Sequence, residues 1–137
     1  QGALPERDVD VYVADTIGEL GLFYRLAPIA FIGRSLVPLG GQNPIEPAKL
    51  GAAILHGPHV YNFADIYAAI DRAHGALPVA DAESLAQALA MLLKDTARTR
   101  AMARAAAQTV ESLGGALERT MRAIEPYILH MDLRHSG

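Results

Sequence analysis

Short apolar runs alternate with helical patterns over the first eighty residues of the chain. Four runs have the length of strands and are bounded by Gly, Pro or Asp, at 9–14, 29–33, 52–56 and 76–80. The helical patterns between them lie at 18–26, 44–50 and 63–74. This β-α-β-α-β-α-β order predicts an α/β fold, a Rossmann-like parallel sheet of about four or five strands. Pro78 favours an edge position or a late start for the last strand.

From residue 81 onward the pattern is helical throughout. A first helix is expected to open at residue 81 or 82. Its inward face is expected to carry Leu85, Leu89, Leu92 and Leu93. A second helix, from about residue 96, is expected to stop at the glycine pair 114–115. A third is expected to run to about residue 131, and Pro126 should kink or end it.

Composition narrows the class of protein. The 137 residues are 51% hydrophobic, enough to bury the core of one domain but not comfortably of two. A net charge of −3 and an aromatic content of 6% argue against a nucleic-acid interface. No apolar run reaches the length of a membrane span and no signal peptide opens the chain, so a soluble piece is expected. The chain starts at Gln1 rather than Met, as a piece cut from a longer protein does.

No metal or cofactor site is expected. Cysteine is absent, which excludes disulfides and thiolate metal sites and fits a reducing compartment. His56 and His59 are close in sequence but flank the turn residues Gly57 and Pro58. They therefore lack the geometry of a helical pair of metal ligands.

The most informative stretch is residues 40–48, with the sequence Gly-Gly-Gln-Asn-Pro-Ile-Glu-Pro-Ala. Its two glycines free the backbone for a close approach to a ligand. Asn43 is suited to cap a helix with Pro44 in its first position, and Glu46 has capping-box spacing from Asn43. A helix start beside a glycine turn can hold an anion, and Glu46 can accept hydrogen bonds from sugar hydroxyls. A capping box without any ligand is the alternative interpretation.

A second stretch repeats this pattern after the first apolar run. It reads Asp15-Thr16-Ile17-Gly18-Glu19-Leu20, in which Thr16 and Glu19 again have capping-box spacing. The carboxyl ends of parallel strands meet at one edge of an open sheet, where ligands bind. We therefore expect Glu19 and Glu46 to lie near each other in a shared site.

Four motifs, in this order and at these spacings, resemble those of the 3-deoxy-D-manno-octulosonic acid (Kdo) transferases of lipid A biosynthesis. They are Asp15–Leu20, Phe31-Ile32-Gly33-Arg34-Ser35-Leu36-Val37-Pro38, Gly40–Ala48, and Gly57-Pro58-His59 with Asn62-Phe63. The resemblance covers essentially the whole chain. Two departures stand out, since Arg34 interrupts a more usual Gly-Gly-Ser and Gln42 stands where His is common.

The resemblance implies a type-B glycosyltransferase, in which two Rossmann-like domains face each other across a cleft. Residues 1–137 resemble part of the C-terminal nucleotide-sugar-binding domain, with the alternating part at 1–80 and the helical part at 81–137. The implied donor substrate is CMP-Kdo, with no further cofactor and no metal. The acceptor, a lipid A precursor, and the glutamate expected as general base belong to an N-terminal domain outside this chain. A nucleotide-contacting Pro-Arg pair at the start of the donor domain is also outside it.

These implications set what the chain is expected to do. No catalytic residue is expected within it, and alone it is expected to be inactive as a transferase and to bind CMP weakly. The parent protein is expected at the cytoplasmic face of the bacterial inner membrane.

By the same resemblance, the CMP contacts of the family correspond to Ile17, Gly18, Glu19, Asn43, Pro44, Ile45 and Glu46. These are the two stretches that the residues themselves indicate. Ser35 is as well suited to a local turn bond as to a phosphate. Arg34 fits a solvated loop better than a bond to the donor carboxylate, and Asn62 fits a helix cap.

The terminal helix of such enzymes crosses to the N-terminal domain. The apolar residues that follow Pro126 here are Tyr127, Ile128, Leu129, Met131 and Leu133. Uncovered apolar surface on this helix, and a dimer formed through it, are therefore expected.

Two other functions remain open from the sequence. One is another type-B glycosyltransferase or an epimerase that binds a UDP-sugar, which binding of CMP against UDP and UMP would separate. The other is a non-catalytic doubly wound signalling module of the receiver type. Such a module needs clustered acidic residues after its first strand and a later lysine, but Asp15 has no acidic neighbour and the lysines are Lys49 and Lys94.

Overall fold

The fold was obtained as a computed structural model. It describes residues 9–14 and 17–135, with the backbone alone for 126–135. Three parallel strands form one sheet in the order β1-β2-β3, and they are β1 (Ile29–Phe31), β2 (Ala53–His56) and β3 (Ala76–Pro78). The register places Ala30 beside Ile54 and His56 beside Pro78. The predicted Rossmann-like α/β class is confirmed and Pro78 does lie in an edge strand, but the expected four or five strands are three in the described residues.

The strand predicted at 9–14 is not formed. These residues have no regular secondary structure, and Val11 and Val13 are 78% and 77% exposed. An apolar β-branched composition favours a strand, but a strand also needs a neighbour to pair with, and here the segment has no place in the sheet. The ring of Tyr12 lies 6.0 Å from that of Phe23, measured between centroids. Asp15 and Thr16, which come next, lie outside the described residues.

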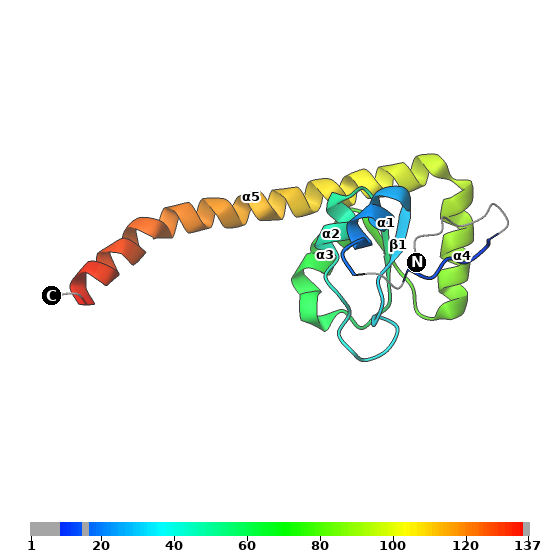
Figure 1. Cartoon of the computed structure of the whole chain (residues 1–137), viewed down its shortest axis with the longest axis horizontal. Helices are drawn as coiled ribbons and strands as arrows, with labels where there is room; N and C mark the ends of the chain where they lie inside the picture. The colour runs from blue at the N-terminus through cyan, green and yellow to red at the C-terminus, as the bar shows by residue number, and fades with distance from the viewer. Residues whose placement is uncertain (1–8, 15–16, 136–137) are drawn as a thin grey trace.

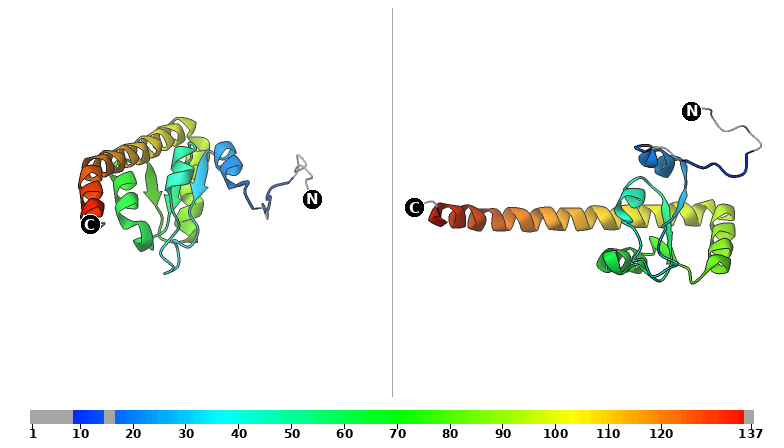
Figure 2. Two further views of the ribbon diagram at one scale, coloured as in Figure 1. Left: turned by 60° about the vertical axis from the view of Figure 1, so that its left-hand side comes forward. Right: turned by 60° about the horizontal axis from the view of Figure 1, so that its bottom comes forward.

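Helices cover both faces of the sheet (Figures 1 and 2). They are α1 (Leu20–Leu26), α2 (Ile45–Lys49), the 3-10 turn η1 (Tyr61–Phe63), α3 (Ala64–Arg72), α4 (Ala82–Lys94) and α5 (Thr96–His135). Because side chains alternate along a strand, β2 serves two cores. Ile54 packs with residues of α2, α3 and the middle of α5, whereas Leu55 packs with residues of α4 and the start of α5.

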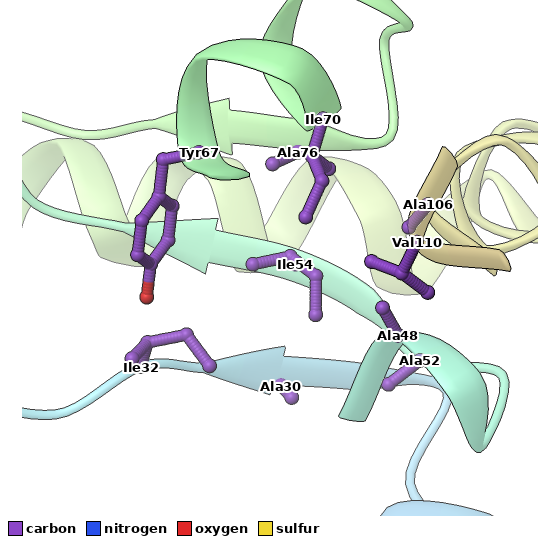
Figure 3. Packing of buried hydrophobic residues seen from close by; sticks show 10 residues of the cluster. All are labelled: Ala30, Ile32, Ala48, Ala52, Ile54, Tyr67, Ile70, Ala76, Ala106 and Val110. Carbon is purple, nitrogen blue, oxygen red and sulfur yellow. The ribbon is translucent and has the colours of Figure 1, made fainter. Parts of the chain in front are cut away.

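Figure 3 shows the first of these two cores, on the α2 and α3 face. Ile54 lies at its centre and Tyr67 at the end where the strands finish, with Ile32 beside it. At the other end the side chains are small, as at Ala52 and Ala106. A Cβ on Gly75 would lie 2.5 Å from the backbone nitrogen of Ala106. The long helix therefore sits almost directly on the sheet, held there by close packing.

Helix α4 starts at Ala82 as predicted. Asp81 is its N-cap and accepts a hydrogen bond of 2.8 Å from the backbone N–H of Ser84, whose hydroxyl completes a capping box. The expected inward face needs one correction, because Leu92 is buried but Leu93 is 67% exposed. Consecutive helical residues point about 100° apart, so Leu93 faces away from the core.

Helix α5 is one continuous helix where the sequence predicted two. Gly114 and Gly115 lie inside it, and neither takes the left-handed conformation that ends a helix. Pro126 does not end it, although Figure 1 shows its last turns curving. The second half of α5 projects far from the rest of the domain (Figure 1). Exposed apolar side chains on that half are Leu117, Met121 and Ile124, with Leu113 one turn before it, and the predicted apolar group at 127–133 lies outside the described side chains.

Candidate functional site

The glycine loop that joins β1 to α2 packs against the turn after β2. Gly40 and Gly41 have φ angles of 84° and 71°, in the left-handed region that favours glycine. A Cβ on Gly40 would lie only 2.2 Å from the side-chain nitrogen of Asn62, and one on Gly41 would lie 3.2 Å from the carbonyl of His59. Contact between the two loops therefore accounts for both glycines. The expected approach of these glycines to a ligand stays a prediction.

The start of α2 differs by one residue from the predicted capping box. Pro44 is the N-cap and Ile45 the first helical residue, and the side-chain oxygen of Asn43 accepts a hydrogen bond of 2.9 Å from the Ile45 N–H. Glu46 is therefore the second helical residue rather than the third. The bond to Asn43 occupies one of the backbone donors that the sequence assigned to an anion. The carboxylate of Glu46 is exposed.

The segment Ile17-Gly18-Glu19 forms the turn that leads into α1. Gly18 has a φ angle of 95°, and Ile17 is fully exposed. Glu19 is the N-cap of α1, and its backbone carbonyl accepts bonds from the N–H groups of Leu22 and Phe23. The predicted capping box placed Glu19 inside the first turn, but the helix begins after it. Its expected partner Thr16 lies outside the described residues.

The structure brings these two segments together beside β1. Helices α1 and α2 lie against each other in Figure 1 and are in contact. One carboxylate oxygen of Glu46 lies 3.7 Å from where a Cβ on Gly21 would be, and Gly21 is two residues after Glu19. Burial raises the pKa of the Tyr24 hydroxyl, and the charge of Glu46 raises it further. Glu46 therefore lies at the junction of α1 and α2, next to the turn that carries Glu19.

Ser35 has a structural role in the same loop. It is fully buried, and its hydroxyl donates to the carbonyl of Ile32 at 2.5 Å and accepts from the N–H of Gly57 at 2.8 Å. Its own carbonyl accepts from the N–H of His59 at 2.9 Å. Of the two roles weighed from the sequence, the local turn bond is therefore the one observed.

The backbone conformation at Arg34 explains why glycine is the more usual residue at this position of the resembled motif. Its φ angle is 62°, a left-handed conformation in which a side chain is strained and glycine is not. The more usual glycine at this position is thus accounted for by backbone conformation. The side chain of Arg34 is exposed, as expected for a loop arginine.

His56, at the end of β2, is buried and has a partner at each ring nitrogen. Nδ1 lies 2.8 Å from the carbonyl oxygen of Gly57, and Nε2 lies 3.0 Å from a carboxylate oxygen of Asp71 on α3. Both partners are acceptors, so only the doubly protonated imidazolium donates both bonds. Burial by itself lowers the pKa of His56, but the hydrogen bonds to Asp71 and Gly57, together with the Asp71 charge, outweigh it and raise the pKa above 6.5.

The sign of the resulting pH dependence follows from this shift. A histidine whose pKa is higher in the folded protein than in the unfolded chain adds stability that is complete below its ordinary pKa. That contribution is lost as the pH rises through the raised pKa of His56. The fold is therefore expected to lose stability toward alkaline pH at this group.

Tyr67 connects this histidine to the glycine loop. Its ring lies 4.7 Å from that of His56, and its hydroxyl donates a hydrogen bond of 2.6 Å to the backbone carbonyl of Gln42. Burial raises the pKa of Tyr67, and the neighbouring Asp71 and Tyr24 raise it further. Because Gln42 is held through its backbone, this bond does not depend on which side chain stands at position 42.

Sequence reasoning missed the group formed by His56, Tyr67 and Asp71. It weighed His56 with His59 as metal ligands and found no metal geometry. In the described residues no cluster of three metal-ligating side chains is present. His56 and Asp71 are 15 residues apart, on β2 and on α3, the helix that joins β2 to β3, and that spacing carries no periodic signal. The sequence carries one weak indication of this group, which is that Tyr67, Ile70 and Asp71 have the spacing of residues on one helical face.

Asn62 does not have the predicted role of a helix cap. The N-cap of α3 is Phe63, and the side chain of Asn62 donates to the carbonyl of Leu39 at 3.4 Å.

In the part of the chain that the structure describes, no helix has both the length and the hydrophobicity of a membrane span. A hollow of about 430 Å³ lies at the amino end of β3, beside α5, and is lined by Ala73, His74 and Arg98 among others, away from the predicted donor contacts.

Proteins of known function and structure are similar to most of this chain. No family model matches the chain. It is 36% identical over 124 residues to the 3-deoxy-D-manno-octulosonic acid transferase of Bordetella pertussis, covering 90% of this chain and 29% of that protein. It is 33% identical over 126 residues to the Haemophilus influenzae enzyme of the same name, covering 91% and 30%. The chain thus spans less than a third of these relatives.

A solved structure shows a similar fold. It is the crystal structure of the C-terminal CMP-Kdo binding domain of WaaA from Acinetobacter baumannii, with 31% identity and a TM-score of 0.67 over 71% of this chain and 51% of that one. The class of fold is therefore that of the C-terminal domain of a type-B glycosyltransferase, of which the chain is a part. Within that class the chain belongs with the Kdo transferases, to which it is homologous over most of its length, as its motifs implied.

Proposed function

We propose that this chain is part of the donor-binding, C-terminal domain of a Kdo transferase. It binds CMP-Kdo, whose Kdo group the parent enzyme transfers to a lipid A precursor in lipopolysaccharide biosynthesis. The observation that carries the proposal is the meeting of α1 and α2, which puts Glu46 next to the turn of Glu19. The similarity of the chain to a solved CMP-Kdo binding domain supports it.

The residues proposed to contact the nucleotide have distinct roles. The carboxylates of Glu46 and Glu19 accept hydrogen bonds from the ribose hydroxyls, as acidic residues do in dinucleotide-binding folds. The turn at Gly18 and the start of α2 approach the phosphate through their backbone. Side by side, the two segments form one face of the site, lined by Ile17, Gly18, Glu19, Asn43, Pro44, Ile45 and Glu46.

The same proposal assigns the chemistry to another part of the parent protein. The acceptor and the general base belong to the N-terminal domain, and the reaction takes place at the cytoplasmic face of the inner membrane. A base must reach the proton that it removes, and reactants must be held together. This chain by itself therefore binds donor without transferring Kdo.

Affinity for free nucleotides tests the proposal against the UDP-sugar alternative. This chain supplies only one face of a two-domain site and therefore lacks much of the binding energy of the whole site. The expected Kd for CMP is about 100 µM or weaker. CMP is expected to bind more tightly than UMP. The ribose and phosphate contacts assigned above are the same for both nucleotides, so the preference comes from groups that hydrogen-bond the base. Titration calorimetry on this chain measures both. Equal or tighter binding of UMP or UDP would support the alternative, and no heat from CMP at millimolar concentration would refute donor binding.

We also propose that the projecting half of α5 is a protein contact, through a dimer of this chain. Leu113, Leu117, Met121 and Ile124 recur at helical spacing and are all exposed. Analytical ultracentrifugation is expected to show dimers that Leu117→Lys dissociates. Arg119→Ala, about 200° around the helix from Leu117, should leave the dimers intact. A chain that stays monomeric at every concentration would contradict the proposal.

A further inference from the structure

We propose that His56, as an imidazolium, is a positioning residue of the donor site, because it fixes the two loops on which Asn43 and Glu46 depend. This inference rests on the proposed function, since it concerns how that site is held. The observations that carry it are the contacts of His56 and of the residues one step away from it.

The first link runs from His56 to the turn after β2. Nδ1–H of the imidazolium donates to the carbonyl of Gly57 at 2.8 Å, and the N–H of Gly57 donates to the hydroxyl of Ser35 at 2.8 Å. The carbonyl of Arg34 in turn accepts from the N–H of Gly41 at 3.2 Å. The bond from Nδ1 is thus the first of a series of hydrogen bonds, joined through the backbone of Gly57 and of residues 34–35, that reaches the glycine loop.

The second link runs through Tyr67 to the residue before Asn43. The Tyr67 ring packs on the imidazole at 4.7 Å, and its hydroxyl holds the Gln42 carbonyl at 2.6 Å. The buried histidine is thus connected by two routes to Gly41 and Gln42, the residues that directly precede Asn43.

This arrangement depends on the positive charge of the protonated His56. Among the described residues, the ionisable groups in contact with His56 are Asp71, through its carboxylate, and Tyr67, through its ring, and both lie on α3. On the same face β1, β3, α2 and α5 contribute apolar side chains such as Ile32, Ala76, Ala48 and Ala106. A neutral histidine has one N–H and two acceptors to satisfy. Loss of the proton therefore releases either the Gly57 carbonyl or Asp71.

Asp71→Asn is the variant that tests the inference, because it keeps the size of a half-buried side chain and removes its charge. ¹⁵N-imidazole NMR from about pH 5.5 to about pH 8.5 follows the protonation of His56. We expect the wild type to titrate above an ordinary histidine and the variant to titrate at lower pH. His74→Asn is the control, since His74 is an exposed histidine in the turn after α3 with a φ of 59° that Asn tolerates.

The affinity for CMP is measured over the same pH range. In the wild type it should fall about threefold to tenfold as His56 loses its proton, the effect of one hydrogen bond. In Asp71→Asn the fall should move to lower pH by the same interval as the His56 titration, while His74→Asn follows the wild type. The phosphate of CMP itself titrates near pH 6, but that contribution cancels between variants.

The possible results distinguish a failure of the positioning role of His56 from a failure of the proposed donor binding. If CMP binds and the affinity profiles of wild type and Asp71→Asn coincide although their His56 titrations differ, the positioning role is wrong and donor binding stands. A His56 that stays neutral throughout the range overturns the inference in the same way. If CMP binds at no pH, the proposed function fails and this inference fails with it.

Discussion

Gly57→Ala is expected to destabilise the fold by about 3 kcal/mol, at the upper end of the cost of overpacking a core. A Cβ on Gly57 would lie 2.2 Å from the carbonyl oxygen and 2.4 Å from the carbonyl carbon of Ser35, and 2.6 Å from the nitrogen of Leu36. All three are backbone atoms, which no side-chain rotation can move away. The loop after β1 would have to shift and release the bond between Gly57 and Ser35.

Urea denaturation followed by circular dichroism measures this change. Gly114→Ala is the matched control, because a Cβ at that position meets nothing within 4 Å and the residue lies inside α5. It is expected to stabilise the chain by up to about 1 kcal/mol, since alanine is the better helix former. A Gly57→Ala protein as stable as the wild type would show that the two loops do not pack as described.

Glu46→Ala is expected to weaken the binding of CMP by at least about tenfold. A hydrogen bond to a charged group contributes about 1.5–3 kcal/mol, so the loss of a carboxylate bound to ribose has an effect of this size. The side chain is exposed, so the fold should keep its melting temperature. Calorimetry with CMP measures the affinity of both proteins. Glu46→Gln, which keeps the size of the side chain, separates the effect of the charge from that of the contact.

Glu83→Ala is the control for a general loss of negative charge. Glu83 is an exposed residue in the first turn of α4. That helix packs on the opposite face of the sheet from α2. Its removal should leave the CMP affinity unchanged. Equal affinities of Glu46→Ala and the wild type would remove Glu46 from the proposed site.

The sequence predicted those elements whose signals are local. The strands at β1, β2 and β3 are bounded by Pro or Gly and are apolar, and Gly51 ends α2 as a glycine in the left-handed conformation should. Asp81 opens α4 for an equally local reason, a capping bond to Ser84. The periodicity of apolar residues and these local signals were therefore sufficient to predict the fold class.

The errors occur where a local preference depends on a distant partner. Residues 9–14 have the composition of a strand but no neighbour in the sheet. Gly114 and Gly115 can stop a helix, yet α5 continues through them, and each costs only about 1 kcal/mol relative to alanine.

The candidate site, too, was predicted where the signal is local and missed where it depends on distant residues. The segments that carry Glu19 and Glu46 were found from glycine and carboxylate spacing, and the fold places them together. The group of His56, Tyr67 and Asp71 was not found, because His56 meets Asp71 only when α3 folds back beside the end of β2. Ser35 was left undecided for the same reason, since its bond partner Gly57 is 22 residues away.

Amide NMR of this chain during titration with CMP tests the central claim most directly, because it locates the bound nucleotide. The proposed site predicts that the largest shifts fall on Gly18, Glu19, Asn43, Ile45 and Glu46, with smaller shifts in the loop around Gly41. Shifts that gather instead at the hollow beside β3 and α5, around Ala73 and His74, would contradict the account.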